Sequence, residues 1–327
     1  MNYKIILEYD GSRYNGWQRQ GNTDNTIQGK LEEILSKYFN QDIEIHGSGR
    51  TDAGVHALGQ VANFKVYSSK FSAGALGQDN TVRVLGSNNY GRALASNSPD
   101  SALASNSSGN SLASNSLSSA LVSNSSGSTL SSNIIVVTSD ENILLDLNSF
   151  LPEDIRIISL ESVDERFHAR LNAKEKTYRY TFCLNNKRSV FERKYCALLP
   201  SISSNNNSSF EHFVPDIELM KSASLLLLGE HDFLGFSDTK TKKSTIRRID
   251  NISFKLEDNN SCKYLVVDFT GNGFLYHTVR LLMGTLIQIG LHNCNPSIID
   301  EILNTKDRKK VPYMAPAEGL TLVEVKY

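Results

Sequence analysis

Residues 49–56 hold the residue types needed for catalysis by a single carboxylate, since they read Gly-Arg-Thr-Asp-Ala-Gly-Val-His. Arg50 precedes Asp52 by two positions, and a nearby cation favours the ionised form of a carboxyl group. An ionised, oriented aspartate is suited to nucleophilic catalysis. The same spacing also fits an ordinary surface ion pair in a turn, which is the commoner interpretation of such a pattern by itself.

Strand-like segments flank this motif and are expected to hold it in place. Residues 43–46 and 61–66 both alternate apolar and polar side chains, which predicts two β-strands joined by a loop. Loops carried on rigid strands often contain catalytic or binding groups. Gly47, Gly49 and Gly54 permit positive φ angles and the close approach of another molecule to the backbone.

The motif resembles the active-site motif of the TruA family of tRNA pseudouridine synthases. Five more segments resemble motifs of that family and follow one another in the family's order. They are 9–20 (Tyr-Asp-Gly-Ser-Arg-Tyr-Asn-Gly-Trp-Gln-Arg-Gln), 167–170 (Phe-His-Ala-Arg), 176–180 (Lys-Thr-Tyr-Arg-Tyr), 273–280 (Gly-Phe-Leu-Tyr-His-Thr-Val-Arg) and 317–320 (Ala-Glu-Gly-Leu). Together they span nearly the whole chain, so the resemblance is far more specific than any one motif.

The resemblance implies an isomerisation in which uracil is detached from C1′ of its ribose, rotated and reattached through carbon. It implies no metal and no cofactor. Asp52 would be the nucleophile, or the carboxylate that initiates cleavage of the glycosidic bond. Arg50 and Arg280 resemble the family's basic residues beside it, so that one would pair with Asp52 and the other with phosphate. Arg280 also lies in an apolar segment, where a buried arginine requires a partner.

The remaining site residues implied by the family would shape the surroundings of the base. Tyr178 resembles the aromatic residue that stacks on the target uracil, and its phenol could assist proton transfer at C5. Packing of Tyr178 in the core with Tyr180 and Phe182 is the alternative. Leu320 resembles the apolar residue under the reacting uracil, although plain core packing fits it equally. Arg170 resembles a residue that lines the same cleft.

The family acts on the anticodon arm at tRNA positions 38 to 40, and works as a homodimer that straddles one tRNA. We therefore expect a cytoplasmic homodimer whose partner is the anticodon stem-loop of tRNA. A catalytically silent RNA-binding protein of the same fold is the alternative. A hydrolase would need a second carboxylate motif matched to Asp52, and the sequence offers none.

Composition sets the outer limits. The chain has 327 residues, which predicts about two domains, and a net charge of −1, which speaks mildly against a nucleic-acid binder. Basic residues gather instead in two clusters that could contact phosphates. The clusters are Lys240, Lys242, Lys243, Arg247 and Arg248, and then Lys306, Arg308, Lys309 and Lys310.

The sequence predicts no membrane span, signal peptide, disulfide framework or metal site. The apolar stretch 274–291 is interrupted by polar residues, which favours a buried helix. The four cysteines are far apart in sequence and are expected to be reduced thiols. They are Cys183, Cys196, Cys262 and Cys294.

Four histidines lack metal-ligand spacing and are expected to be structural or to contact RNA. They are His46, His56, His168 and His277.

Residues 68–133 do not fit the globular pattern, because they are rich in Ser, Asn, Ala and Gly with a leucine at every ninth position. The leucines are Leu76, Leu85, Leu94, Leu103, Leu112, Leu121 and Leu130. A β-solenoid is one interpretation of such a repeat. One apolar residue in nine offers little to bury against the entropy of ordering the chain. We therefore expect a disordered insertion.

Outside this segment the pattern predicts an α+β fold. Strands are expected at 3–9, 177–184, 252–256, 265–269 and 320–325, and helices at 26–38, 142–150, 216–228, 274–291 and 297–303. Strands and helices do not alternate regularly, which favours a mostly antiparallel sheet. The family resemblance adds two related α+β halves, 1–172 and 173–327, that share this sheet on either side of a central catalytic cleft.

Overall fold

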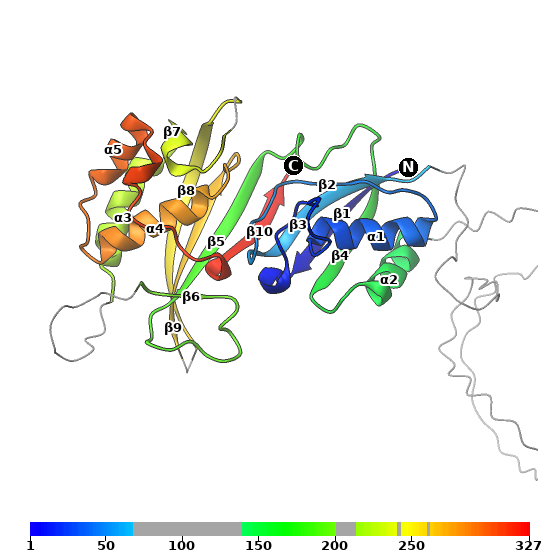
Figure 1. Cartoon of the computed structure of the whole chain (residues 1–327), viewed down its shortest axis with the longest axis horizontal. Helices are drawn as coiled ribbons and strands as arrows, with labels where there is room; N and C mark the ends of the chain where they lie inside the picture. Colours follow the sequence, from blue (N-terminus) through cyan, green and yellow to red (C-terminus); the bar gives the residue numbers. More distant parts are fainter. Residues whose placement is uncertain (68–138, 201–213, 241–242, 260–261) are drawn as a thin grey trace, which may run out of the picture. The chain divides into compact units, whose positions relative to one another are not determined.

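The computed structural model describes residues 1–67, 139–200, 214–240, 243–259 and 262–327 (Figure 1). All of them belong to one unit, which comprises Met1–Thr81 and Thr138–Tyr327. The nine-residue repeat predicted to be a disordered insertion lies outside the described residues.

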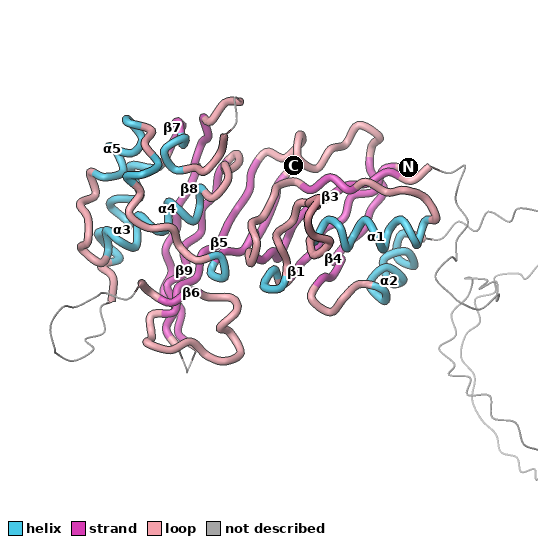
Figure 2. The backbone as a smooth tube through the Cα atoms, viewed as in Figure 1, coloured by secondary structure: helices cyan, strands magenta, loops and turns pink. Residues whose placement is uncertain are grey.

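The described strands form one mixed sheet, drawn in magenta in Figure 2. Its order is β4-β1-β3-β10-β5-β9-β8-β7, with β2 paired to β3 and β6 to β5. The strands are β1 (Asn2–Tyr9), β2 (Ile45–Gly47), β3 (His56–Lys65), β4 (Ile155–Val163), β5 (Glu175–Cys183), β6 (Ala197–Leu198), β7 (Gly229–Asp232), β8 (Ile246–Asp258), β9 (Lys263–Gly271) and β10 (Leu320–Lys326). Only β10–β3 and β5–β6 are parallel among these pairs, so the α+β class and the mostly antiparallel sheet are confirmed.

Five α-helices accompany the sheet in the described part of the chain. They are α1 (Ile27–Phe39), α2 (Asp140–Phe150), α3 (Ile217–Ser224), α4 (Thr278–Gly290) and α5 (Ile298–Thr305). Helix α1 contacts α2, and α3 contacts α4 (Figure 1). Helix α4 is buried on almost every side, as the apolar stretch 274–291 predicts. None of the described helices is long and apolar enough to cross a bilayer.

Local sequence signals explain where α1 begins and ends. Thr26 has an extended backbone, and its hydroxyl accepts a hydrogen bond from the Gly29 N–H at 3.1 Å. Asn40 ends the helix in the left-handed conformation with φ of 49°, which asparagine tolerates better than most residues. Ile27, Leu31 and Leu35 are fully buried on one face.

Strand β10 connects the two parts of the sheet that carry the predicted site residues. It pairs in parallel with β3, which follows the Asp52 loop, and antiparallel with β5, which carries Tyr178. Leu322 of β10 lies directly opposite Tyr178. The loop and the tyrosine are therefore brought together by a strand formed by the last residues of the chain.

All four cysteines are free thiols, in agreement with the expectation. Three of them, although distant in sequence, pack into one small buried cluster with Tyr264 and Val266. They are Cys183, Cys196 and Cys262. Burial raises the pKa of the Cys196 thiol to about 12, which makes that group a poor nucleophile.

Candidate active site

The Asp52 loop lies between β2 and β3 and is fixed by the N-terminal segment 9–20. The backbone N–H of Trp17 donates to the Thr51 carbonyl at 3.0 Å. The hydroxyls of Tyr9 and Thr51 are 2.8 Å apart and buried. Gly54, at a φ of 78°, donates its N–H to the Tyr14 carbonyl at 3.4 Å. The segment therefore supports the loop backbone on both sides of Asp52.

Close backbone approaches explain two glycines of this arrangement. A side chain at Gly11 would place its Cβ 2.0 Å from the Val55 carbonyl oxygen. Gly16 has a φ of 91°, and a Cβ there would be 2.8 Å from the Thr51 oxygen. The N–H of Gly11 also donates to Nδ1 of the buried His56 at 3.1 Å, which ties the end of the motif to the same segment.

Arg280 pairs with Asp52 across 228 residues of sequence. Its Nη1 lies 3.3 Å from Asp52 Oδ2, and its Nε donates to the Ala315 carbonyl at 2.8 Å. The side chains of Asp52 and Arg280 are only 14% and 11% exposed. The ion pair is therefore shielded from solvent and is stronger than a surface pair.

His277, which the sequence analysis did not assign to the site, is the second group beside Asp52. Its Nε2 lies 3.6 Å from Asp52 Oδ2, and its Nδ1 lies 2.7 Å from Asp238 Oδ2. Arg308 in turn donates from Nε to Asp238 Oδ1 at 2.9 Å. The signal in the sequence was the closeness of His277 to Arg280, because a residue just before a helix lies near the side chains of its first turn.

Tyr178 is buried on β5, where it lies opposite Phe269 of β9. Its ring meets that of Phe274 edge to face at 5.4 Å. Burial raises the pKa of the Tyr178 phenol, with smaller contributions from Tyr9 and the Asp52 carboxylate. The phenol is therefore protonated at neutral pH. Leu320 is buried too, and it pairs with Tyr180, not with Tyr178.

Four cationic side chains lie near one another beside this site, and they are Arg50, Arg170, Lys176 and Arg247. Lys176 donates to the Ser48 carbonyl at 2.6 Å, and its pKa is lowered to about 8 by burial and then by the charges of Arg170 and Arg247. The pKa of Arg170 is lowered by desolvation and by the charge of Arg50. None of the four forms a salt bridge with a carboxylate in the described structure, so Arg50 does not pair with Asp52.

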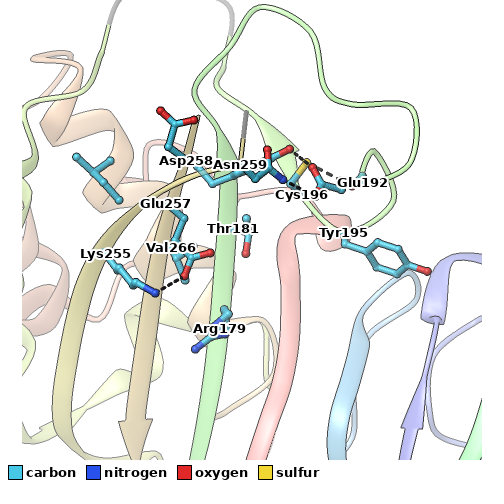
Figure 3. Close-up of a pocket in the computed structure, with 12 residues that line it drawn as sticks. Arg179, Thr181, Glu192, Tyr195, Cys196, Lys255, Glu257, Asp258, Asn259 and Val266 are labelled. Atoms are coloured by element: carbon cyan, nitrogen blue, oxygen red, sulfur yellow. Dashed lines mark hydrogen bonds and ion pairs between the residues drawn. The ribbon is translucent and has the colours of Figure 1, made fainter. Parts of the chain in front are cut away.

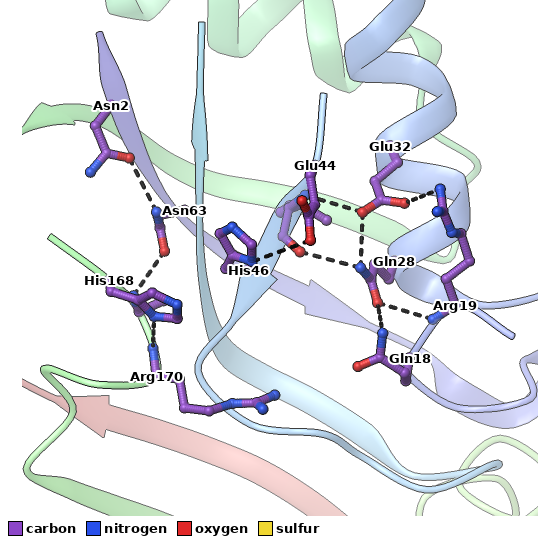
Figure 4. Close-up of polar contacts among 12 residues, drawn as sticks. Asn2, Gln18, Arg19, Gln28, Glu32, Glu44, His46, Asn63, His168 and Arg170 are labelled. Atoms are coloured by element: carbon purple, nitrogen blue, oxygen red, sulfur yellow. Dashed lines mark hydrogen bonds and ion pairs between the residues drawn. The ribbon is translucent and has the colours of Figure 1, made fainter. Parts of the chain in front are cut away.

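Hydrogen bonds to β1 and β3 fix the segment 167–170 (Figure 4). Asn63 accepts from the Ala169 N–H at 2.8 Å, and Asn2 donates to the Phe167 carbonyl at 2.9 Å. The His168 ring stacks on His46 with centroids 5.1 Å apart. These contacts hold the backbone of Arg170 close to the Asp52 loop.

A groove of about 580 Å³ lies elsewhere, over β5, β8 and β9 (Figure 3). Arg179 and Thr181 line it from β5, whereas none of the predicted site residues does. Within the described ranges, no three His, Cys, Asp or Glu side chains are grouped so that they could hold a metal ion.

Comparison with known proteins defines the family. A family model described as tRNA pseudouridine synthase matches residues 5–98 and 223–327. A tRNA pseudouridine synthase A from Bacillus sp. KSM-64 is 35% identical, and a tRNA pseudouridine synthase A 1 from Clostridium tetani is 34% identical. A tRNA pseudouridine synthase A 2 from Bacillus cereus is 33% identical. Each alignment covers 100% of this chain and 99% of the relative.

The chain therefore belongs to the tRNA pseudouridine synthase family, as the resemblance of its motifs to TruA enzymes implies. The enzymes of this family are isomerases that act on uridine in tRNA.

Proposed function

We propose that this protein converts uridine to pseudouridine at positions 38, 39 and 40 in the anticodon arm of tRNA, with Asp52 as the nucleophile. The observation that carries this proposal is the environment of the Asp52 carboxylate. Arg280 and His277 both lie closest to Oδ2, whereas Oδ1 accepts no hydrogen bond within the described structure. Oδ1 is thus the oxygen available to a substrate.

The chemistry follows from this arrangement. Oδ1 attacks C1′ of the ribose as the bond from C1′ to N1 of uracil breaks, and the electron pair of that bond leaves with the base. The base rotates, C5 forms a bond to C1′, and the aspartate is released. The proton on C5 is then lost, and N1 gains one. The product is an isomer of the substrate, so no oxidant, reductant or metal is consumed.

Arg280 contributes by orienting Asp52, since its Nη1 lies 3.3 Å from Oδ2 and both side chains are shielded from solvent. Tyr178 supplies an aromatic surface for the extruded uracil, and Leu320 supplies apolar contact beneath it. Because burial keeps the Tyr178 phenol protonated, it is suited to donate a hydrogen bond to the base.

The cations beside the site would bind the RNA backbone. Arg50 repels Arg170, and Arg170 and Arg247 repel Lys176. A phosphate group would relieve that repulsion. Arg50 and Arg170 are exposed and therefore accessible to RNA. The near-neutral net charge is compatible with this role, because binding depends on the local grouping of charge.

The family resemblance supports three further proposals. The halves 1–172 and 173–327 meet at a catalytic cleft, with Asp52 contributed by the first half and Tyr178 and Arg280 by the second. The enzyme is a homodimer on one tRNA. It works in the cytoplasm, where its free thiols stay reduced.

Incubation with unmodified tRNA transcripts, followed by mapping of pseudouridine, tests the function. We expect modification at positions 38 to 40 by the parent and by Asp42→Asn, an exposed control on the segment before β2. Asp52→Asn should bind tRNA and form none. Product formation by a clean preparation of Asp52→Asn would remove Asp52 from its role. A parent that binds tRNA without modifying it would be the catalytically silent alternative.

A further inference from the structure

His277 occupies a backbone conformation that is uncommon for residues other than glycine. It lies immediately before α4 with a φ of 66° and a ψ of −2°, and its side chain forms no cap to the helix. Residues other than glycine are uncommon at positive φ, although asparagine, aspartate and histidine adopt it more often than most. Such strain often accompanies a functional requirement. If function requires histidine here, the contacts of its imidazole ring should show why.

The ring bridges two carboxylates and has little freedom to move. Nδ1 lies 2.7 Å from Asp238 Oδ2, and Nε2 lies 3.6 Å from Asp52 Oδ2. Asp238 is fixed behind it by Arg308. The Tyr276 ring stacks on the imidazole with centroids 3.7 Å apart and planes inclined by 27°. Only 15% of the His277 side chain is exposed.

The second contact decides which Asp52 oxygen is available. Arg280 reaches Asp52 through a single nitrogen, Nη1, at 3.3 Å. One contact of this length leaves rotation about χ2 of an aspartate weakly restrained, because terminal torsions of this kind are broad. His277 approaches the same Oδ2 through Nε2, so the two residues together restrain the plane of the carboxylate, and Oδ1 accepts no hydrogen bond from the described residues.

We propose that His277, supported by Asp238 and Arg308, is a positioning residue that holds Asp52 so that Oδ1 faces the substrate. This inference rests on the proposed function. It assigns no contact between His277 and the RNA. Loss of the imidazole should therefore reduce the rate of the chemical step and spare the binding of tRNA.

The test is His277→Asn, because asparagine tolerates the left-handed backbone and lacks the ring nitrogen that faces Asp52. We expect kcat to fall about 10²-fold, the scale of misplacing a reacting group by about 1 Å, with KM and tRNA affinity unchanged. His292→Asn is the matched control. His292 also has a positive φ, 57°, near the other end of α4, and is exposed, so parental kcat is expected.

Chemical rescue separates positioning from a structural role. His277→Gly relaxes the backbone and leaves a vacancy beside the Tyr276 ring. Added imidazole should restore a large part of kcat in this variant and should have no effect on Asp52→Asn. Asp238→Asn should show a smaller loss of kcat, also without loss of tRNA affinity.

Parental kcat in either His277 variant would overturn the inference. So would a loss that parallels a fall in melting temperature or tRNA affinity and is not restored by imidazole. Failure of the proposed function is distinguishable, because in that case the parent and the His292→Asn control also form no pseudouridine at positions 38 to 40.

Discussion

Replacement of Lys176 by methionine should stabilise the fold while weakening the enzyme's hold on tRNA. The Lys176 ammonium is largely removed from solvent and lies near Arg170 and Arg247, and among the described residues its hydrogen-bond partner is the Ser48 carbonyl at 2.6 Å. Its pKa falls from the ordinary 10.5 to about 8, which corresponds to about 3 kcal/mol of unfavourable charge burial. Methionine has a similar length and shape without the charge.

The lost hydrogen bond to Ser48 offsets part of this gain, since a charged hydrogen bond contributes about 1.5–3 kcal/mol. The net stabilisation expected at pH 7 is therefore about 1 kcal/mol. The pH dependence is a sharper measure, because it reports only the difference in the Lys176 pKa between the folded and the unfolded protein. Between pH values of about 8 and 10.5 the unfolded chain binds the lysine proton and the folded protein does not, so stability of the parent rises with pH.

Urea unfolding at pH 7 and at about pH 9.5 would measure this effect. The advantage of Lys176→Met over the parent should shrink by about 2 kcal/mol between the two conditions. Lys174→Met removes an exposed ammonium from the segment just before β5, and should alter stability equally at both. An identical difference between Lys176→Met and the parent at both pH values would refute the burial of an unpaired charge. Filter binding should show weaker tRNA affinity for Lys176→Met if Lys176 contacts phosphate.

Two further predictions concern the base and the RNA backbone. Tyr178→Phe should keep parental tRNA affinity because the ring remains, and its steady-state turnover should fall by about 10²–10⁴-fold if the phenol transfers a proton. Tyr178→Ala should lose both affinity and turnover, and parental kinetics in that variant would return Tyr178 to a purely structural role. Affinity for tRNA should fall steeply with salt, and the double variant Arg50→Ala with Arg170→Ala should reduce the slope of log K against log salt by about 2. An unchanged slope in the double variant would mean that the tRNA phosphates contact other residues.

Elements with a strong local signal were predictable. The helix expected at 26–38 is α1, Ile27–Phe39, because a threonine cap and an apolar stripe mark it. The strand expected at 177–184 is β5, where Tyr178, Tyr180 and Phe182 alternate into the core. The prediction of a helix over 216–228 was too long, since α3 ends at Ser224 and Leu225–Leu227 form a 3-10 turn with Leu225 exposed.

Strand β4, Ile155–Val163, was not predicted, and its sequence explains why. Its pairing with β1 shifts register between Ile6 and Leu7, so apolar side chains do not alternate strictly along it. A bulge of this kind inserts a residue and reverses the faces that follow. The alternation used to recognise strands therefore fails within β4, although its neighbours in the sheet fix its position.

The site residues also fall into those that the sequence could identify and those that it could not. The resemblance to the family singled out Asp52 and Arg280, which the structure brings to 3.3 Å. Proximity in sequence suggested that Arg50 pairs with Asp52, yet in the described structure the carboxylate pairs with Arg280 and forms no ion pair with Arg50. Asp238 meets His277, and Arg308 meets Asp238, only through the tertiary fold, so no local pattern could have identified them.

Because β10 joins the two parts of the sheet, the position of the Asp52 carboxylate depends on elements from both parts. Asp52 lies on a loop fixed by the N-terminal segment, whereas its partners Arg280 and His277 come from the start of α4. Between these parts β10 pairs with β3 on one side and β5 on the other. A carboxylate held by groups from both parts is oriented only when the sheet is complete. The partly folded chain would therefore expose an aspartate that lacks both of its anchors.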